Sequence, residues 1–337
     1  MQAQPERDAL NSAIMALSDT VDRMGHSLAA AVEKGGKVDR SLLDLKQPQA
    51  FQYALGLSEL RALKALFDYA CRLEQAYEWG LTRSYAAHCL QQMGSRVLLN
   101  PEVYGLQEAQ LQQLAGCREL VETSLCSGYL QSLSEELLSR EVERGGKYGL
   151  DAEHVEMNQL FSRFADERIA PVAEEIHRHD LLIPEPLIKE LAELGVFGIS
   201  IPEEYGGHFL DHLTMCIATE ELSRASLGAG GSVITRPEIC AKALLKGGTE
   251  EQKNYWLPRI SSGETIVSIA VTEPNAGSDV ASLRVSARPG VVMGESGYLI
   301  NGEKTWCTFA GRADLLALLA RTGSVEQGSR GLSLFLV

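Results

Sequence analysis

One change in the spacing of apolar residues constrains the fold of this chain more than any other feature. Up to Gly263, apolar residues recur every three or four positions, which is typical of amphipathic helices. After Gly263 they alternate with polar residues in short runs, which is typical of strands. The sequence therefore predicts an α+β multidomain protein, with helices first and strands last. Its 337 residues are also too many for one small core.

The first part of the helical region, residues 1–148, is expected to be a separate helical extension. Its clearest amphipathic stripe consists of Leu60, Leu63, Leu66, Phe67, Ala70, Leu73 and Tyr77. Further periodic stretches cover residues 9–32, 81–99 and 106–140, with breaks at Gly35-Gly36, Gln47-Pro48, Asn100-Pro101 and Gly145-Gly146. No catalytic constellation is evident in this extension, so we interpret it as a packing or interface module.

A polar, Gly-rich stretch at residues 141–148 predicts a linker to a second helical domain, residues 149–263. Asp151 can cap a helix that continues to His179, with a break or bend at Pro171. Further helices are expected at residues 186–194, 213–224 and 237–245, and after the cap residue Thr249. Strands are expected at Thr265–Val271, Ser282–Ala287, Tyr298–Gly302, Leu315–Ala320 and Leu332–Val337.

The strand region contains the clearest candidate for a binding site. The apolar run 266–271 stops at a loop of Pro, Asn, Gly, Ser and Asp, where backbone N–H groups and hydroxyls suit an anionic or carbonyl-rich ligand. Asn301-Gly302 predicts a hairpin turn, and in the following strand Trp306 and Thr308 would share one face. An aromatic wall beside a hydroxyl suits a flat heteroaromatic cofactor. The alternative is an ordinary antiparallel hairpin with a buried tryptophan.

Two strings in this region resemble the flavin-contacting motifs of the acyl-CoA dehydrogenase family. They are residues 271–279, Val-Thr-Glu-Pro-Asn-Ala-Gly-Ser-Asp, and residues 300–308, Ile-Asn-Gly-Glu-Lys-Thr-Trp-Cys-Thr. Strings at residues 203–207, 248–253 and 257–264 support the resemblance in the family's order. The resemblance covers residues 151–337. It implies that residues 149–263 form the family's N-terminal α domain and that residues 264–337 form an incomplete, antiparallel β-barrel-like middle domain. The family's C-terminal four-helix domain is expected to be absent from this chain.

The resemblance also assigns roles to individual residues. It implies an FAD cofactor that is contacted by Val271, Thr272, Gly277, Ser278, Trp306 and Thr308. Thr272 and Thr308 would hydrogen-bond the isoalloxazine ring, with Trp306 and the backbone of Val271 against it. Gly277 and Ser278 would lie by the pyrophosphate or by the pantetheine arm of the substrate. Arg236 is a candidate to bind a substrate carboxylate, and a helix-start or interface arginine is the alternative.

The expected reaction is α,β-dehydrogenation of an acyl-CoA by α-proton abstraction and β-hydride transfer to the flavin. No residue of this chain matches the family's catalytic base, which is expected beyond Val337. We therefore expect no turnover from these 337 residues alone. A helical extension in front of the core resembles that of a branch of the family with a short branched or dicarboxylic substrate, and this resemblance implies (2S)-methylsuccinyl-CoA, converted to mesaconyl-CoA in the ethylmalonyl-CoA pathway. The alternatives are another short- or branched-chain acyl-CoA dehydrogenase, an acyl-CoA oxidase, and a non-catalytic flavin-binding interaction module.

The resemblance implies electron-transfer flavoprotein as the electron acceptor and a homo-oligomer, either a dimer or a tetramer. A formal net charge of −14 argues against a nucleic-acid or anionic-membrane partner. Seven widely spaced cysteines, no membrane-length apolar run and no signal segment predict a cytoplasmic protein with reduced thiols. No metal site is expected, because the surroundings of His177, His179, His208 and His212 offer no closed ligand set.

Overall fold

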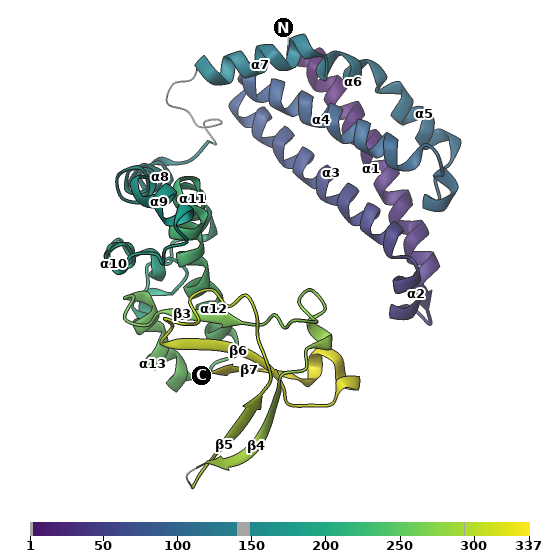
Figure 1. The fold of residues 1–337 in the computed structure, drawn as a ribbon. Helices are drawn as coiled ribbons and strands as arrows, with labels where there is room; N and C mark the ends of the chain where they lie inside the picture. Colours follow the sequence, from purple (N-terminus) through teal and green to yellow (C-terminus); the bar gives the residue numbers. More distant parts are fainter. Residues whose placement is uncertain (1–2, 140–148, 293) are drawn as a thin grey trace. The chain divides into compact units, whose positions relative to one another are not determined.

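A computed structural model describes residues 3–139, 149–292 and 294–337 of the chain (Figure 1). The chain divides into two compact units, Met1–Gly149 and Leu150–Val337. The break expected at Gly145-Gly146 and the linker expected at residues 141–148 lie outside the described residues.

The first unit is helical, as the sequence predicts. Its helices are α1 (Ala3–Val32), α2 (Arg40–Leu45), α3 (Gln47–Leu73), α4 (Ala76–Val97), α5 (Glu108–Gly116), α6 (Arg118–Ser124) and α7 (Ser127–Ser139). Gly35 and Gly36, at φ 63° and 75°, form the turn between the two-residue strands β1 (Glu33–Lys34) and β2 (Lys37–Val38). The described part of the periodic stretch predicted at residues 106–140 contains three helices, α5, α6 and α7. Its first break follows Gly116, where glycine's low helix propensity favours an end.

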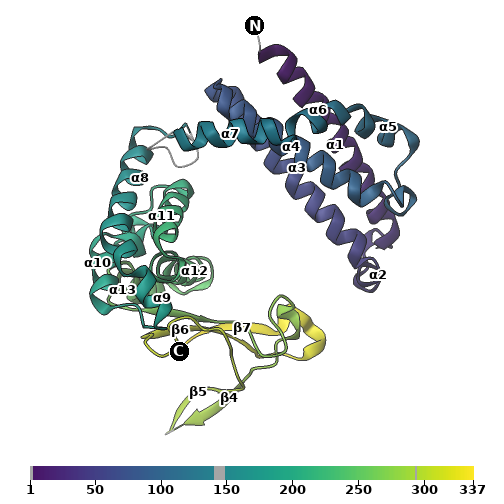
Figure 2. The same ribbon diagram turned by 45° about the horizontal axis from the view of Figure 1, so that its top comes forward.

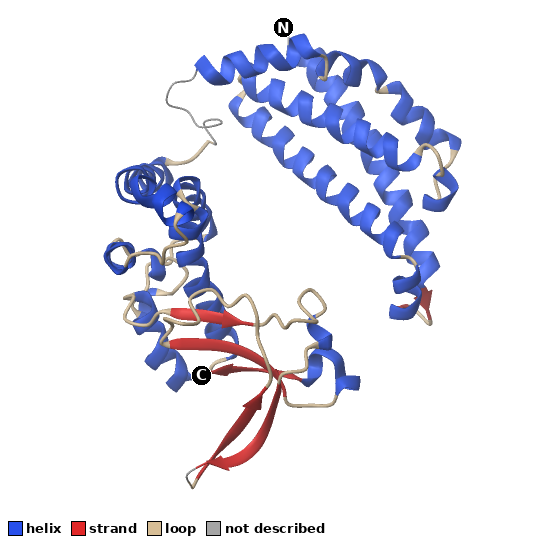
Figure 3. Ribbon diagram, in the orientation of Figure 1, coloured by secondary structure: helices blue, strands red, loops and turns tan. Residues whose placement is uncertain are grey.

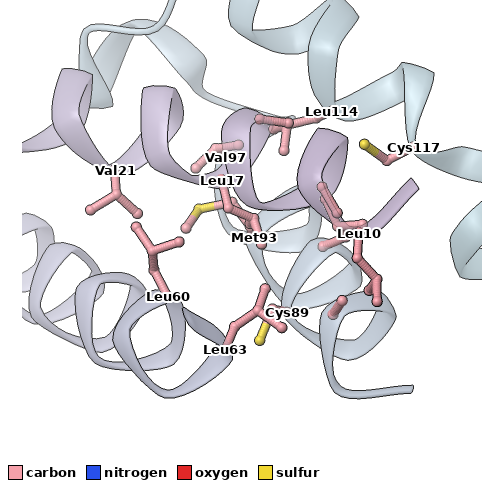
Figure 4. Close-up of a cluster of buried hydrophobic side chains, with 14 of the residues drawn as sticks. Leu10, Leu17, Val21, Leu60, Leu63, Cys89, Met93, Val97, Leu114 and Cys117 are labelled. Atoms are coloured by element: carbon pink, nitrogen blue, oxygen red, sulfur yellow. The ribbon is translucent and has the colours of Figure 1, made fainter. Parts of the chain in front are cut away.

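The first unit is held together by one apolar cluster, to which α1, α3 and α4 each contribute a face (Figure 4). Its members include Leu10, Leu17, Val21, Leu60, Leu63, Cys89, Met93, Val97, Leu114 and Cys117. The predicted stripe is buried at Leu60, Leu63 and Ala70. Tyr77, predicted to continue that stripe, instead belongs to α4, because α3 ends at Leu73.

The second unit begins with the predicted helix, which carries a local irregularity next to Pro171. It consists of α8 (Ala152–Phe164), a π-helical turn at Ala165–Ile169, and α9 (Ala170–Arg178). Because Pro171 has no N–H to donate to the preceding turn, the helix widens immediately before it. The prediction of a break or bend at this proline is confirmed.

Four more helices complete the helical part, namely α10 (Glu185–Glu193), α11 (His212–Ala225), α12 (Ser232–Gly247) and α13 (Glu250–Ser261). The predicted caps are confirmed, since Asp151 accepts from the N–H of His154 and Thr249 forms a capping box with Gln252. The Gly-rich segment before α12 forms a π-helical turn, Leu227–Gly231.

Close packing explains two glycines of this π-helical turn, Gly230 and Gly231. A Cβ on Gly230 would lie 2.4 Å from the carbonyl oxygen of Leu222 in α11, and one on Gly231 would lie 1.9 Å from the Ser223 hydroxyl. Only glycine allows this approach of the two backbones. The turn thereby fixes where α12 starts, five residues before the predicted start at Pro237.

In the second unit the strands of the sheet follow helix α13 in the sequence, and Figure 3 draws them in red. They are β3 (Val267–Ala270), β4 (Ser286–Val292), β5 (Glu295–Asn301), β6 (Leu315–Arg321) and β7 (Leu332–Leu336). β4 pairs antiparallel with β5 and β6 with β7, but β3 and β6 run parallel. The described sheet is therefore mixed, whereas an antiparallel one was expected. Non-local packing decides this pairing, and the alternation of residues does not encode it.

Two local strand predictions are wrong. Residues 280–282 form a 3-10 turn, and β4 begins only at Ser286. The hairpin joins β4 to β5, with Val292 opposite Glu295, and Asn301-Gly302 instead ends β5. Gly302 has φ 139°, and a Cβ there would lie 3.0 Å from the Cα of Val285. Gly302 thus allows the backbone to pass close to that of Val285, and it does not form a two-residue turn.

Helices α12 and α13 pack against β3 and β6, an arrangement visible in Figure 2. The cluster between them includes Cys240, Leu244, Leu257, Val267 and Leu315. The β4–β5 hairpin projects away from these helices (Figure 1), and β5 is exposed along nearly its whole length. This packing fixes β3, and with it the segment that leaves β3 toward the candidate site.

Candidate functional site

The two motifs picked out from the sequence lie side by side at the end of β3. The N–H of Thr305 donates to the carbonyl oxygen of Thr272 at 2.9 Å. The Ser268 hydroxyl, on β3, donates to the carbonyl oxygen of Thr308 at 2.7 Å. The structure therefore brings the segment 271–273 together with the segment 304–308.

A buried ion pair joins these segments. Glu273 and Lys304 have side chains that are 8% and 7% exposed, and their charged atoms are 2.8 Å apart. The Lys304 ammonium also donates to the carbonyl oxygen of Val271 at 2.8 Å, while the Glu273 carboxylate accepts from the N–H groups of Arg284 and Val285 at 2.7 and 2.8 Å. Burial alone would raise the pKa of Glu273, but Lys304 and the two amide donors outweigh it and hold that pKa below its ordinary value.

A second buried cation holds the loop that follows Glu273. The Arg321 guanidinium, on β6, donates to the carbonyl oxygens of Ala281 at 2.7 Å and Leu283 at 2.8 Å. It also donates to Ser324 at 3.0 Å and Gly328 at 3.1 Å. The far end of the loop is thus anchored to the sheet. No role for Arg321, Glu273 or Lys304 was predicted from the sequence, although charges at the edges of apolar runs were a usable signal.

Arg236 reaches the candidate site from α12. Its guanidinium donates to the Thr308 hydroxyl oxygen at 3.1 Å and to that of Thr235 at 3.2 Å. The side chain is half-buried, and no carboxylate of the described residues forms an ion pair with it. A half-buried cation with only hydroxyl partners retains the capacity to bind an anion.

The remaining predicted residues differ in their surroundings. Trp306 is 89% exposed and has φ 59°, so it lies neither on a strand nor in a core. The shared strand face expected for Trp306 and Thr308 is therefore wrong. Gly277 lies against Thr272, since a Cβ on it would be 3.4 Å from the Thr272 Cγ2. Ser278 is exposed in the loop, and among the described residues no recorded contact joins it to Arg236 or Thr308.

These residues fit a planar heteroaromatic group. The Thr308 hydroxyl oxygen accepts from Arg236, so its proton is available to a ligand. The Thr305 hydroxyl oxygen is buried and has no hydrogen-bond partner among the described residues, and such a group requires one. The exposed indole of Trp306 offers an aromatic face for stacking. Together they provide hydrogen-bonding groups and a stacking surface beside one another in the sequence.

Other kinds of site find little support in the described ranges. Within residues 3–139, 149–292 and 294–337, no group of three or more His, Cys, Asp or Glu side chains is arranged to hold a metal ion. The seven cysteines are all free. No helix of the described residues is long and apolar enough to cross a membrane.

Two family models match the second unit. Residues 151–264 match the acyl-CoA dehydrogenase N-terminal domain, and residues 268–337 match the acyl-CoA dehydrogenase middle domain. Similarity to one relative extends into the first unit. The (2S)-methylsuccinyl-CoA dehydrogenase of Cereibacter sphaeroides is 36% identical over 321 residues, which cover 92% of this chain and 58% of that protein.

Solved structures are similar to the second unit. The glutaryl-coenzyme A dehydrogenase in complex with glutaryl-CoA is 33% identical with a TM-score of 0.51, covering 57% of this chain and 48% of that chain. A structure of PigA with FAD and proline is 27% identical with a TM-score of 0.51, covering 57% and 49%. The chain spans about half the length of the curated relatives it matches, from 58% of the first to 43% of the next.

Proposed function

The chain belongs to the acyl-CoA dehydrogenase family, and we propose that it supplies the FAD-binding surface of a dehydrogenase that desaturates a carboxylate-bearing acyl-CoA. The observation that carries this proposal is the hydrogen bond from Arg236 to the hydroxyl of Thr308, 72 positions away in the sequence. This hydrogen bond places the Arg236 cation beside the hydroxyl that the family resemblance assigns to the flavin. Among the described residues, no carboxylate forms an ion pair with this cation.

In this proposal the residues of the chain bind and orient the reacting groups. The hydroxyls of Thr272 and Thr308 and the backbone of Val271 hold the flavin ring, and Trp306 covers it. Gly277 and Ser278 lie by the pyrophosphate or by the pantetheine arm, where Ser278 also binds substrate. FAD, when bound, supplies the hydride acceptor. Glu273 is not the base, because its carboxylate already accepts from Lys304 and two amide groups.

We propose that the catalytic base is supplied by residues outside this sequence. Removal of the α-proton needs a carboxylate with a raised pKa, and burial beside a bound thioester would provide it. The pKa of Glu273 is instead lowered. The 337 residues alone should therefore bind flavin and thioester without turning over.

The proposed substrate is (2S)-methylsuccinyl-CoA and the product mesaconyl-CoA, as in the ethylmalonyl-CoA pathway. Support comes from the similarity of this chain to the (2S)-methylsuccinyl-CoA dehydrogenase of Cereibacter sphaeroides. That similarity covers 92% of this chain and includes the helical extension. Arg236 provides the chemistry, because a guanidinium can bind the substrate carboxylate through paired hydrogen bonds. We further propose electron-transfer flavoprotein as the electron acceptor, a cytoplasmic homo-oligomer, and domains at residues 1–148, 149–263 and 264–337.

The test is an anaerobic visible spectrum of the FAD-loaded chain, to which methylsuccinyl-CoA, isobutyryl-CoA and butyryl-CoA are added separately. Methylsuccinyl-CoA should perturb the flavin band at the lowest concentration and without bleaching it. Arg236→Gln should weaken the binding of methylsuccinyl-CoA about tenfold or more and leave the binding of butyryl-CoA unchanged. Equal loss for both thioesters would contradict carboxylate binding, and bleaching would show that the base lies within this chain.

Three other functions have distinct outcomes in this experiment or on the later admission of air. A flavin band that no thioester perturbs would favour a non-catalytic flavin-binding interaction module. Rapid reoxidation by oxygen, in a protein whose flavin is reduced by substrate, would favour an acyl-CoA oxidase. A stronger response to isobutyryl-CoA would favour another branched-chain dehydrogenase.

A further inference from the structure

Glu273 and Lys304 make contacts that reach beyond their own ion pair. Lys304 holds the carbonyl of Val271, which is the first residue after β3. Glu273 holds the N–H groups of Arg284 and Val285, where the chain returns from the loop 274–283. One buried pair therefore joins three backbone segments, at residues 271–273, 284–285 and 304–305.

Net stability alone is a poor explanation for such a pair. Removing two charges from water carries a desolvation cost that their attraction often only balances, and apolar side chains of similar volume can be equally stable. The pair provides fixed geometry instead, because a carboxylate with three donors and an ammonium with two acceptors tolerate little displacement. The segments that it fixes carry the residues assigned to the flavin.

We propose that Glu273 and Lys304 are positioning residues that clamp the flavin-contacting segments into register before the cofactor binds. Lys304 sets the exit of the chain from β3, and therefore the placement of Thr272. Glu273 sets the return of the loop that contains Gly277 and Ser278. This proposal rests on the proposed FAD site, and neither side chain is assigned a contact with the flavin or the substrate.

The clamp requires an acceptor at position 273 and a donor at position 304, and not merely opposite charges. Lysine at position 273 could not accept from the two amide groups, so exchanging the charges should not restore the site. Lys304→Arg keeps a cationic donor and should preserve much of the function. These expectations separate a backbone clamp from a simple electrostatic attraction between two segments.

The experiment measures FAD affinity by fluorescence quenching, together with the visible circular dichroism and midpoint potential of the bound flavin, in the full chain. Lys304→Met and the milder Glu273→Gln should weaken FAD binding by about tenfold or more and change the dichroism. The FAD affinity of Lys304→Arg should remain within about threefold of that of the unchanged protein. The double exchange Glu273→Lys with Lys304→Glu should bind as weakly as the single variants. The matched control is Glu303→Gln, an exposed carboxylate beside Lys304, which should change nothing.

Hydrogen exchange at the amides of Arg284, Val285 and Thr305 tests the clamp separately from flavin binding. Exchange there should accelerate in Glu273→Gln and Lys304→Met and not in the control, even without FAD. Unchanged exchange and wild-type FAD affinity in a folded Glu273→Gln protein would overturn the clamp. If the unchanged protein binds no FAD while these amides still respond, the proposed function fails and the clamp survives only as a structural feature.

Discussion

The two units of this chain are stabilised in different ways. In the first unit, helices α1, α3 and α4 bury a cluster of packed apolar side chains (Figure 4). In the second unit, the candidate site is held by buried polar groups, among them Glu273, Lys304 and Arg321, that bind backbone atoms. The first arrangement tolerates changes of charge at its surface. The second fixes a geometry and depends on every hydrogen-bond partner being present.

The largest loss of stability is expected from breaking the buried ion pair of the second unit. Lys304→Met would leave the Glu273 carboxylate buried without its cation, and breaking such a pair costs about 3–5 kcal/mol of unfolding free energy. Hydrogen-exchange mass spectrometry should show the loss in peptides of residues 150–337 and not in those of residues 3–139. Lys189→Met, at an exposed lysine of α10, is the control and should cost less than about 0.5 kcal/mol. Equal protection from hydrogen exchange in Lys304→Met and Lys189→Met would mean that the Glu273–Lys304 pair contributes nothing to stability.

Removing side-chain volume from the apolar cluster should instead destabilise the first unit. Leu63 is fully buried in the cluster of the first unit, and Leu63→Ala leaves a cavity that costs about 3 kcal/mol. The same exchange measurement should place this loss in residues 3–139. Leu45→Ala, at an exposed leucine of α2, should have little effect. Destabilisation of both units by Leu63→Ala would contradict the independence of their cores.

The features that could be predicted from the sequence are local ones. The caps at Asp151 and Thr249 and the irregularity at Pro171 depend on residues within one helical turn. The parallel pairing of β3 with β6 and the true position of the β4–β5 hairpin depend on packing between distant segments. Local turn chemistry at Asn301-Gly302 therefore indicated the wrong hairpin.

The candidate site was predictable in its membership and not in its contacts. The family resemblance picked out Thr272, Trp306 and Thr308 as motif positions. The hydrogen bond between Arg236 and Thr308 and the contacts of Lys304 with Val271 and Glu273 join residues 72, 33 and 31 positions apart. No spacing rule for helices or strands encodes such separations, so only the folded chain reveals them.

A helix cap in the second unit should give a smaller effect. The Thr249 hydroxyl accepts from the N–H of Gln252 at 3.2 Å, and Thr249→Ala removes this partner of α13 at a cost of about 1 kcal/mol. Thr249→Ser retains the hydroxyl and serves as the control. Chemical denaturation should separate the two variants by that amount, and an Ala variant as stable as the Ser variant would mean that solvent replaces the cap.

The smallest effect is expected from a pH-dependent contact in the second unit. His154 is buried, and its two ring nitrogens lie 2.8 Å from an oxygen of Asp151 and 3.0 Å from an oxygen of Asp211. The hydrogen bond with Asp211 is the main cause that raises the pKa of His154. The pKa values of Asp151 and Asp211 are lowered, chiefly by the N–H groups of His154 and Thr214 respectively. Both carboxylates are substantially exposed, at 67% and 44%, so solvent screens the interaction.

The sign of the pH dependence follows from these directions. The stabilisation from His154 is complete below the ordinary histidine pKa of about 6.5 and is lost as pH rises through the raised value. The stabilisation from the two carboxylates is complete above about pH 4 and is lost as pH falls through their lowered values. The difference in denaturation midpoint between the unchanged protein and His154→Gln should therefore be largest between about pH 4 and pH 6.5 and shrink on either side. His26→Gln, at an exposed histidine of α1, should leave the second unit's pH profile unchanged. A difference that grows above pH 8 would show that the folded protein prefers the neutral imidazole, since only a protonated ring gains from facing two carboxylates at once.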